Sequence, residues 1–181
     1  MTTVFISGSR HLSRLSQDVK ARLENVINQH FAVVVGDANG VDKAVQAYLR
    51  EVGYEAVTVF CAGEKCRNNL GHWQVKKIEV DSNLKGRAFY TVKDKKMAEV
   101  SDYGFVLWDG KSQGSYNNIL ELIGRGKKAL VYFAPNKQFT TVKTAADLER
   151  LLKLCSPSFQ AEPNTKNTMR VNAHQQQALG F

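Results

Sequence analysis

Residues 102–126 carry the clearest fold signal in this chain. It begins with an apolar run at residues 103–108, continues with a polar turn at residues 109–114, and ends in a segment with helical character that opens at Ser115. An apolar run followed by a glycine-bearing turn and a capped helix is typical of α/β proteins, which bind anions at such helix starts. Ser112 and Ser115 are the two candidates for the capping residue.

The same alternation of short apolar runs and amphipathic segments continues along the chain. Runs rich in β-branched residues predict strands at residues 2–7, 31–35, 56–60, 103–108 and 128–133. Apolar residues spaced by three and four positions predict helices at residues 16–30, 41–52, 88–101, 115 onward and 144–154. Strands that alternate with helices predict an α/β fold, a three-layer sandwich around a mostly parallel sheet of about five or more strands.

Length and composition indicate one domain and an appendage. The chain has 181 residues, 43% of them hydrophobic, which is enough for a real core, and we assign residues 1–155 to the domain. Residues 156–181 are rich in Ser, Pro, Asn, Gln and Thr, and we expect them to form a flexible polar tail. Between residues 61 and 87 the periodicity fades. This excursion is either a lid or specificity element, or a surface insertion that Trp73 fixes to the core.

The charge of the chain favours an anionic partner. The net charge is +8, but the lysines are dispersed rather than clustered, so nucleotide, nucleic acid and plain solubility all stay open. No apolar run approaches the ~18 residues that a membrane span needs. The first residues also lack the basic stretch and long apolar core of a signal peptide. We therefore expect a cytoplasmic protein without membrane attachment.

The cysteines do not indicate a disulfide framework or a metal site. The chain has three, Cys61, Cys66 and Cys155, and an odd number favours reduced thiols. The spacing of the first two to His72 is loosely compatible with a metal, but a structural zinc site needs a fourth ligand in register. We expect neither a metal nor a cofactor.

Polar turns with glycine follow three of the predicted strands, at residues 8–10, 36–42 and 109–115. In a parallel α/β sheet the ligand binds outside the carboxyl ends of the strands, near the point where the strand order reverses. Since all three turns fall at that edge, they predict a single binding site.

Two nucleotide-binding motifs are absent. Gly110-Lys111-Ser112 looks like the end of a P-loop, but five residues separate Gly104 from Gly110 instead of four, and those residues belong to a predicted strand. No predicted strand is followed by a Gly-x-Gly-x-x-Gly fingerprint. The sequence therefore excludes a P-loop NTPase and argues against an ordinary Rossmann dehydrogenase.

Five short motifs in order resemble the SLOG superfamily, and within it the small bacterial YpsA/YspA-like branch. They are Ile6-Ser-Gly-Ser-Arg10, Gly36-Asp-Ala-Asn-Gly-Val-Asp42, Arg67-Asn-Asn69, Lys93-Asp-Lys-Lys-Met97 and Trp108-Asp-Gly-Lys-Ser-Gln-Gly-Ser115. The resemblance implies a Rossmann-like fold that binds nucleotides or their derivatives at the glycine-rich rim. The superfamily includes DNA-processing protein A, cytokinin-activating phosphoribohydrolases and nucleotide-sensing domains of bacterial conflict systems. Because relatives commonly build sites near dimer interfaces, it also implies a homo-oligomer.

The resemblance and the three turns together predict a set of binding residues. Arg10, Lys111 and the turn amides would hold phosphate, while Asp37, Asp42 or Asp109 would bind ribose or base. The predicted ligand-binding residues are Gly8, Ser9, Arg10, Gly36, Asp37, Gly40, Asp42, Arg67, Asn68, Lys93, Asp109, Gly110, Lys111, Ser112, Gly114, Ser115 and Asn118.

The chain departs from the enzymes of the superfamily at two positions. Active phosphoribohydrolases carry an Arg four residues before a Met-Ala pair and a Glu three residues after the threonine of a Gly-Thr pair. Here these positions are Lys93 and Asn118, and an amide cannot serve as the carboxylate that glycosidic cleavage requires. The candidate substitutes are Asp109, Asp94 and Glu121, although Glu121 also fits a solvent-facing helix position.

Three hypotheses follow. The first is a protein that binds a nucleotide or nucleotide sugar, as a sensor for instance, and it needs no carboxylate pair. The second is an N-glycosidase, phosphoribohydrolase or deoxyribosyltransferase-like enzyme acting on nucleotides. The third is a DNA-binding module resembling DNA-processing protein A. The first is preferred because phosphate-binding turns are visible in the sequence and a complete catalytic pair is not.

Overall fold

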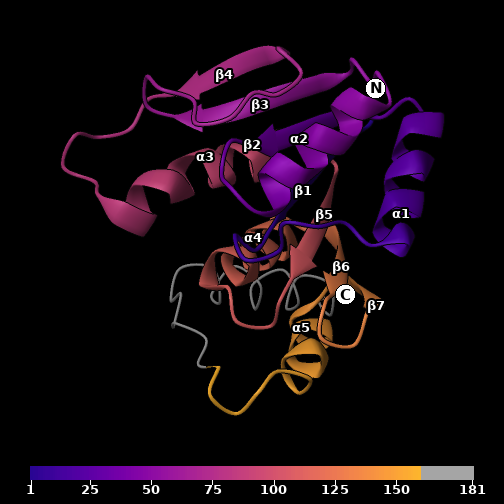
Figure 1. Cartoon of the computed structure of the whole chain (residues 1–181). Helices are drawn as coiled ribbons and strands as arrows, with labels where there is room; N and C mark the ends of the chain where they lie inside the picture. Colours follow the sequence, from indigo (N-terminus) through magenta and orange to yellow (C-terminus); the bar gives the residue numbers. More distant parts are fainter. Residues whose placement is uncertain (160–181) are drawn as a thin grey trace, which may run out of the picture.

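The computed structural model describes residues 1–159, and the remaining residues of the predicted tail, 160–181, lie outside this range. A single seven-stranded sheet forms the middle layer (Figure 1). Its strands are β1 (Thr3–Gly8), β2 (Ala32–Gly36), β3 (Val57–Ala62), β4 (Gln74–Ile78), β5 (Tyr103–Trp108), β6 (Lys128–Phe133) and β7 (Gln138–Val142). The helices are α1 (Gln17–Asn28), α2 (Val41–Glu51), α3 (Gly86–Val100), α4 (Gln113–Gly124) and α5 (Ala145–Leu152).

The strands lie in the order β4-β3-β2-β1-β5-β6-β7. All neighbouring pairs are parallel except β6 and β7, which are antiparallel. The order reverses at β1, because β2 pairs with one side of this strand and β5 with the other. The carboxyl ends of β1 and β5 therefore flank the crevice in which α/β sheets bind ligands.

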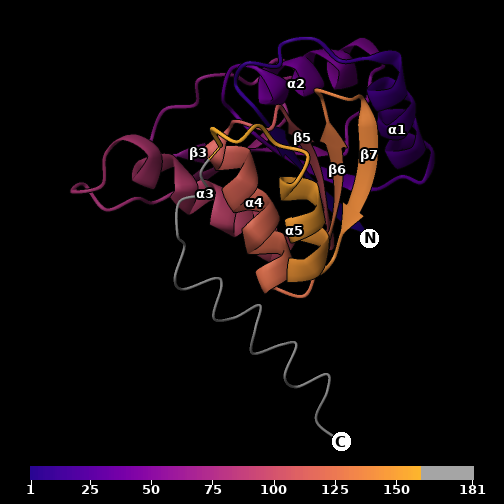
Figure 2. The same cartoon turned by 90° about the horizontal axis from the view of Figure 1, so that it is seen from below.

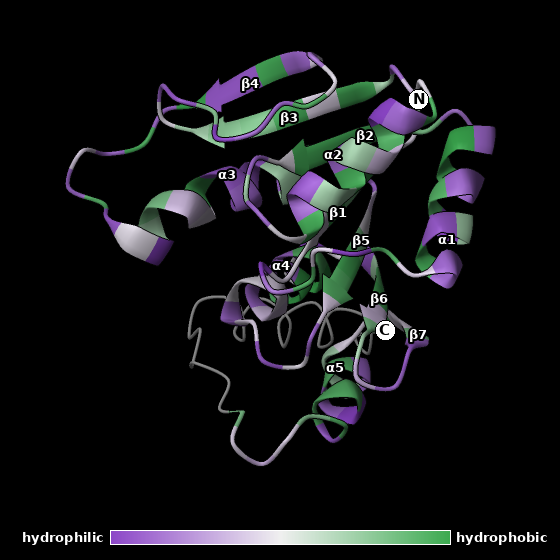
Figure 3. Cartoon of the chain, viewed as in Figure 1, coloured by the Kyte–Doolittle hydropathy of each residue, from purple (hydrophilic) through white to green (hydrophobic). Residues whose placement is uncertain are grey.

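Helices cover both faces of the sheet, with α1 and α2 on one side and α3, α4 and α5 on the other (Figure 2). Consecutive residues of β1 show how the two cores are divided: Phe5 packs into the cluster under α4, and Ile6 packs into the cluster under α2. Figure 3 shows the green, apolar colour concentrated on the central strands. Burial on both faces explains why these strands are continuous apolar runs. The predicted three-layer α/β fold is confirmed.

Helix ends agree with several sequence signals. Ser112 is the residue that caps α4, and its Oγ accepts a hydrogen bond from Ser115 N at 3.3 Å. Thr144 caps α5 in a capping box with Asp147. Gly53, directly after the end of α2, has a φ of 68°, as expected for a glycine that follows a helix.

Among the described residues, none of the helices combines the length and the hydropathy that a membrane span requires.

The cysteine prediction is wrong for two of the three residues. Cys61, on β3, and Cys66 form a disulfide, and their Cα atoms are 5.2 Å apart. The turn that follows β3 folds back within five residues and brings the two side chains together, which an argument from an odd cysteine count cannot detect. Cys155 is a free thiol, and burial raises its pKa.

The end of α3 is held by a lysine from another element. Lys127, just before β6, donates from its Nζ to the carbonyl oxygens of Ala98 and Glu99, both at 2.7 Å, and to that of Ser101. These oxygens are at the carboxyl end of the helix, where a cation is favoured by the helix dipole. Lys127 thus fixes α3 relative to the sheet.

We expect Lys127→Met to lower the free energy of unfolding by about 2 kcal/mol, because hydrogen bonds from a charged donor are lost and the carbonyls stay partly buried. Urea unfolding followed by circular dichroism measures this difference. The matched control is Lys128→Met, which removes the same charge from an exposed neighbouring side chain. Equal losses in the two variants would contradict the assigned role of Lys127.

Candidate functional site

A cavity of about 830 Å³ opens at the carboxyl ends of β1 and β5, beside the start of α4. The first turn of α4 and the middle of α3 form its walls. It is lined by many of the predicted site residues, namely Gly8, Arg10, Asp42, Arg67, Lys93, Asp94, Asp109, Lys111, Ser112, Gly114 and Asn118. The three polar turns thus meet at one cavity, as their positions after parallel strands predict.

The turns after β1 and β5 are joined by Ser9 and Asp109. Ser9 is completely buried, and its Oγ donates to Asp109 Oδ2 at 2.6 Å. The other carboxylate oxygen of Asp109 accepts from the backbone N–H groups of Lys111 at 3.0 Å and Ser112 at 2.7 Å. Burial favours a higher pKa for Asp109, but these hydrogen bonds outweigh it and lower the pKa. Asp109 therefore shapes the turn before α4, and both of its oxygens are already engaged.

The turn after β2 is joined to the segment after β3 by Asp37 and Arg67. The Arg67 guanidinium donates from Nη2 to Asp37 Oδ1 at 2.6 Å, and its backbone N–H donates to Oδ2 at 3.0 Å. Burial alone would raise the pKa of Asp37, but the bonds and charge of Arg67 lower it instead. Asn68 Nδ2 adds a bond to the Asp37 carbonyl at 2.8 Å.

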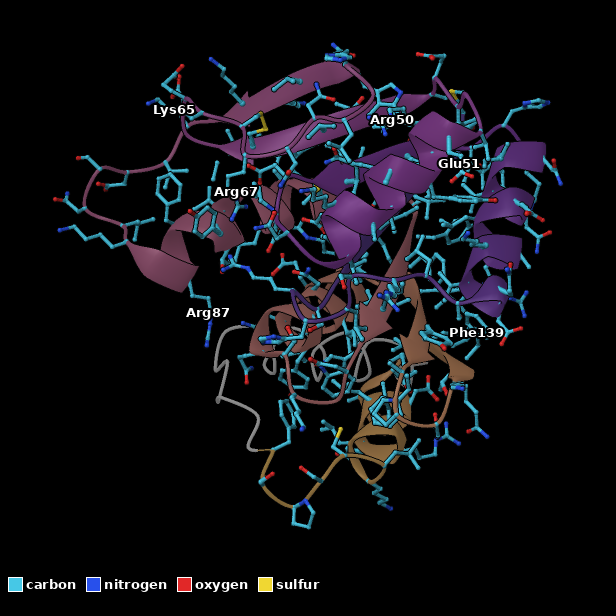
Figure 4. The ribbon with its side chains drawn as sticks, in the orientation of Figure 1. Arg50, Glu51, Lys65, Arg67, Arg87 and Phe139 are labelled. Carbon is cyan, nitrogen blue, oxygen red and sulfur yellow. A yellow bond between two sulfur atoms is a disulfide. The ribbon has the colours of Figure 1, made fainter. Side chains whose placement is uncertain are left out.

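Tyr90, on α3, contacts two arginines of the cavity. The guanidinium carbon of Arg67 lies 4.1 Å from the centre of its ring, and that of Arg10 lies 5.3 Å from it. These are cation–π distances, so the ring orders two long cationic side chains without neutralising them. Figure 4 shows Arg67 beside α3 and Arg87 below the start of that helix.

Three charged groups form the floor of the cavity, and we call Asp42, Lys93 and Asp94 the buried triad. Asp42 and Lys93 are only 6% and 3% exposed. Lys93 Nζ pairs with Asp94 Oδ1 at 2.7 Å. A Cβ placed on Gly36 would lie 2.3 Å from Asp42 Oδ2 and 2.6 Å from Lys93 Nζ. Glycine at position 36 is therefore what lets the two charges approach the end of β2.

Burial raises the pKa of Asp42 to about 6, although the Lys93 charge opposes this shift. For Lys93, burial alone would lower the pKa, but the carboxylates of Asp94 and Asp42 outweigh it and raise the pKa. At neutral pH the ammonium group of Lys93 therefore remains charged between two carboxylates.

Two positions matter for the enzyme hypothesis. Asn118 lines the cavity, and its Nδ2 donates to the Oγ of Ser7 at 3.1 Å. Glu121 does not line the cavity. It is buried rather than solvent-facing, and it pairs with Arg125, one turn further along α4, at 2.8 Å. Of the three candidate carboxylates, the structure thus brings Asp94 and Asp109 to the cavity.

The remaining predicted residues do not line the cavity. Gly40 has a φ of 80° and would, with a Cβ, meet the Arg10 backbone at 2.4 Å, so it permits the turns after β1 and β2 to touch. Ser115 Oγ donates to Ser112 Oγ at 3.1 Å. The predicted residues outside the lining are Ser9, Gly36, Asp37, Gly40, Asn68, Gly110, Ser115 and Glu121.

Sequence reasoning missed ten lining residues, which are Ser7, His11, Ala38, Gly86, Arg87, Tyr90, Thr91, Met97, Gln113 and Asn117. Tyr90 and Thr91 lie one turn before Lys93 and Asp94 on α3, so the helical period is the signal that identifies them. In the described part of the chain, no cluster of His, Cys, Asp or Glu side chains has the arrangement of a metal site.

Comparison with known proteins supports the fold. No family model matches the chain, and no curated protein sequence matches it. Among solved structures, the chain is similar to DNA processing protein A from Helicobacter pylori, studied for its single-stranded DNA binding mode. The TM-score is 0.54 at 14% sequence identity, over 97% of this chain and 81% of that chain. At this identity the two chains share a fold, and the resemblance to the SLOG superfamily remains a resemblance.

Proposed function

We propose that this chain binds a nucleotide or a similar phosphorylated ligand in the cavity between the three turns. The observation that carries the proposal is the set of cations around the cavity. In the described part of the chain, Arg10 lies at a cation–π distance from Tyr90 and has no carboxylate partner, and Lys111, just before α4, lines the same cavity. Guanidinium, ammonium and helix N-terminus together favour phosphate.

The same geometry favours binding over glycosidic cleavage. Glycosidases use two carboxyl groups that flank the scissile bond. Here Asp109 accepts three hydrogen bonds within its own turn and from Ser9, and Asp94 is paired with Lys93. Asn118 supplies an amide where the related enzymes have a carboxylate. We therefore propose a binding or sensing role, and we expect the ligand to leave the protein unchanged.

Single-stranded DNA is the second candidate. It is favoured by the net charge of +8 and by the fold shared with a protein that binds single-stranded DNA. Figure 4 shows Lys65, Arg67 and Arg87 on the same side of the molecule, where they would offer cations to a phosphate backbone. Binding of this kind weakens steeply with salt, in proportion to the number of phosphates neutralised. A mononucleotide held in the cavity would show a much smaller salt dependence.

Arg10→Ala tests the proposal directly. We expect the affinity for the tightest-binding mononucleotide to fall about 10- to 100-fold, because a charge-assisted hydrogen bond to phosphate contributes about 1.5–3 kcal/mol. The Arg10 side chain is exposed and makes no ion pair in the described residues, so the fold should be retained. Isothermal titration calorimetry measures the affinity.

The matched control is Arg50→Ala, which removes the same charge at the far end of α2, on the opposite edge of the sheet (Figure 4). It should bind like the wild type. Equal affinity of the Arg10 and Arg50 variants for the mononucleotide would refute binding at this cavity.

A further inference from the structure

We propose that the Cys61–Cys66 disulfide is a redox latch that holds the Arg67 segment against the binding cavity, an inference that rests on the proposed function of that cavity. Cys61 lies near the end of β3 and is completely buried, whereas Cys66 is only partly buried. The residue after Cys66 is Arg67, which lines the cavity. The disulfide therefore ties the cavity wall to the sheet through a covalent bond one residue away.

The segment that begins at Arg67 is connected to the end of β2 and to α2 by polar contacts. Arg67 holds Asp37 through its backbone and its guanidinium. Further along, the backbone N–H of Leu70 donates to Gln46 Oε1 at 3.0 Å, and Gln46 Nε2 donates to the Gly36 carbonyl at 2.8 Å. These bonds join the segment to the end of β2, so an opening of the segment would break them and withdraw Arg67 from Asp37.

Little besides the disulfide fixes the turn between the two cysteines. Gly63 N donates to the Ile78 carbonyl at 2.9 Å. Glu64 pairs with Lys77, but both side chains are more than half exposed, and such surface pairs contribute little to stability. Lys65 is exposed at the tip, as Figure 4 shows. Without the disulfide, this turn has few contacts that oppose its opening.

The switching step is a thiol–disulfide exchange with a small-molecule thiol reductant. A reductant thiolate attacks the sulfur of Cys66, which is the more accessible of the two. The protein disulfide bond breaks, and Cys61 leaves with the electron pair and takes up a proton. A second reductant thiolate then attacks the mixed disulfide and releases Cys66 as a thiolate, which also takes up a proton. The protein gains two electrons and two protons, and the reductant becomes a disulfide.

Two measurements on the whole chain, oxidised and after reduction with a dithiol, test the latch. The first is the hydrogen-exchange rate of the Arg67 and Leu70 amides, which needs no ligand. The second is the affinity for ADP. We expect reduction to speed the exchange at least about tenfold and to weaken ADP binding by about the same factor, because cross-linking a short loop typically favours its closed form by more than a factor of ten.

Two variants separate this disulfide from the third cysteine. Cys61→Ala/Cys66→Ala should resemble the reduced wild type with or without reductant. Cys155→Ser should respond to reductant as the wild type does. Three free thiols in the protein purified under oxidising conditions would overturn the latch, as would a double variant that still responds to reductant.

The two readouts distinguish failure of the latch from failure of the proposed function. Faster exchange on reduction, with neither ADP nor any mononucleotide bound in either redox state, supports the latch and contradicts the nucleotide site. Unchanged exchange, or ADP affinity that is equal in both redox states, overturns the latch and leaves the nucleotide site in place.

Discussion

Lys93→Met should lower the free energy of unfolding by about 3–5 kcal/mol, the cost of leaving buried charge without its partner. Lys93 Nζ is the cation between Asp42 and Asp94, and all three groups lie at the cavity floor. Methionine has nearly the same volume, so the packing of α3 is preserved while the compensating charge is removed. Urea unfolding near pH 7 measures the loss.

Two further variants make this prediction specific to the buried triad. Lys95→Met removes the same charge from an exposed position on α3 and should change stability by less than about 0.5 kcal/mol. Adding Asp42→Asn to Lys93→Met should recover part of the lost stability, because an uncompensated carboxylate is then removed. A Lys93→Met variant with the unfolding midpoint of the wild type would show that the ion pairs contribute nothing.

The stability of the wild type should fall, relative to Asp42→Asn, as the pH rises from about 4 to about 7. The folded pKa of Asp42, about 6, lies above the ordinary aspartate value of 3.8. The stability that the protonated carboxyl contributes is therefore fully present below pH 3.8 and is lost as the pH rises through 6. The expected change in the difference between the two chains is about 3 kcal/mol, because each tenfold change in proton affinity corresponds to roughly 1.4 kcal/mol.

The comparison with Asp42→Asn isolates this carboxyl. Asp37 and Asp109 have lowered pKa values. The stability that their ionised carboxylates contribute to the folded protein is therefore lost as the pH falls, which is the opposite of the effect of Asp42. Both are present in the two chains, and their contributions cancel to first order in the difference. The asparagine oxygen can keep the bond that Asp42 accepts from Ala38 N. A stability difference that stays constant between pH 4 and pH 7 would show that Asp42 is not a buried carboxyl.

The central strands could be predicted from the sequence because their burial on both faces requires continuous apolar runs, as in β1 and β5. The structure adds β4 and β7. β4 is an edge strand with the sequence Gln-Val-Lys-Lys-Ile and mostly exposed side chains, so it lacks the apolar signal. The sequence of β7, Gln-Phe-Thr-Thr-Val, does carry β-branched residues, but it is short, follows β6 after a tight turn and pairs with it at the edge of the sheet.

Some residues of the candidate site could likewise be predicted from the sequence, and others could not. Positions directly after strands, such as Gly8, Arg10 and Ser112, reach the cavity because topology alone brings them there. The Asp37–Arg67 pair and the Cys61–Cys66 disulfide depend on how residues 61–87 fold back across the sheet edge. No local periodicity encodes that path. The position of Asp109 after β5 predicts its place at the cavity, but its bonds to Ser9 and two backbone amides only become visible in three dimensions.

Whether the cavity binds a nucleotide is decided by the thermal unfolding midpoint, Tm, measured with a panel of nucleoside monophosphates, ADP-ribose, NAD and cyclic nucleotides. A ligand at about 100 times its Kd stabilises the folded state by about 2.7 kcal/mol, which corresponds to a Tm increase of roughly 5–10 °C for a domain of this size. We predict such an increase for at least one member of the panel in the wild type and in Arg50→Ala, and a much smaller one in Arg10→Ala. An unchanged Tm with every nucleotide, together with an increase on adding single-stranded DNA at low salt, would contradict the nucleotide site and favour nucleic-acid binding.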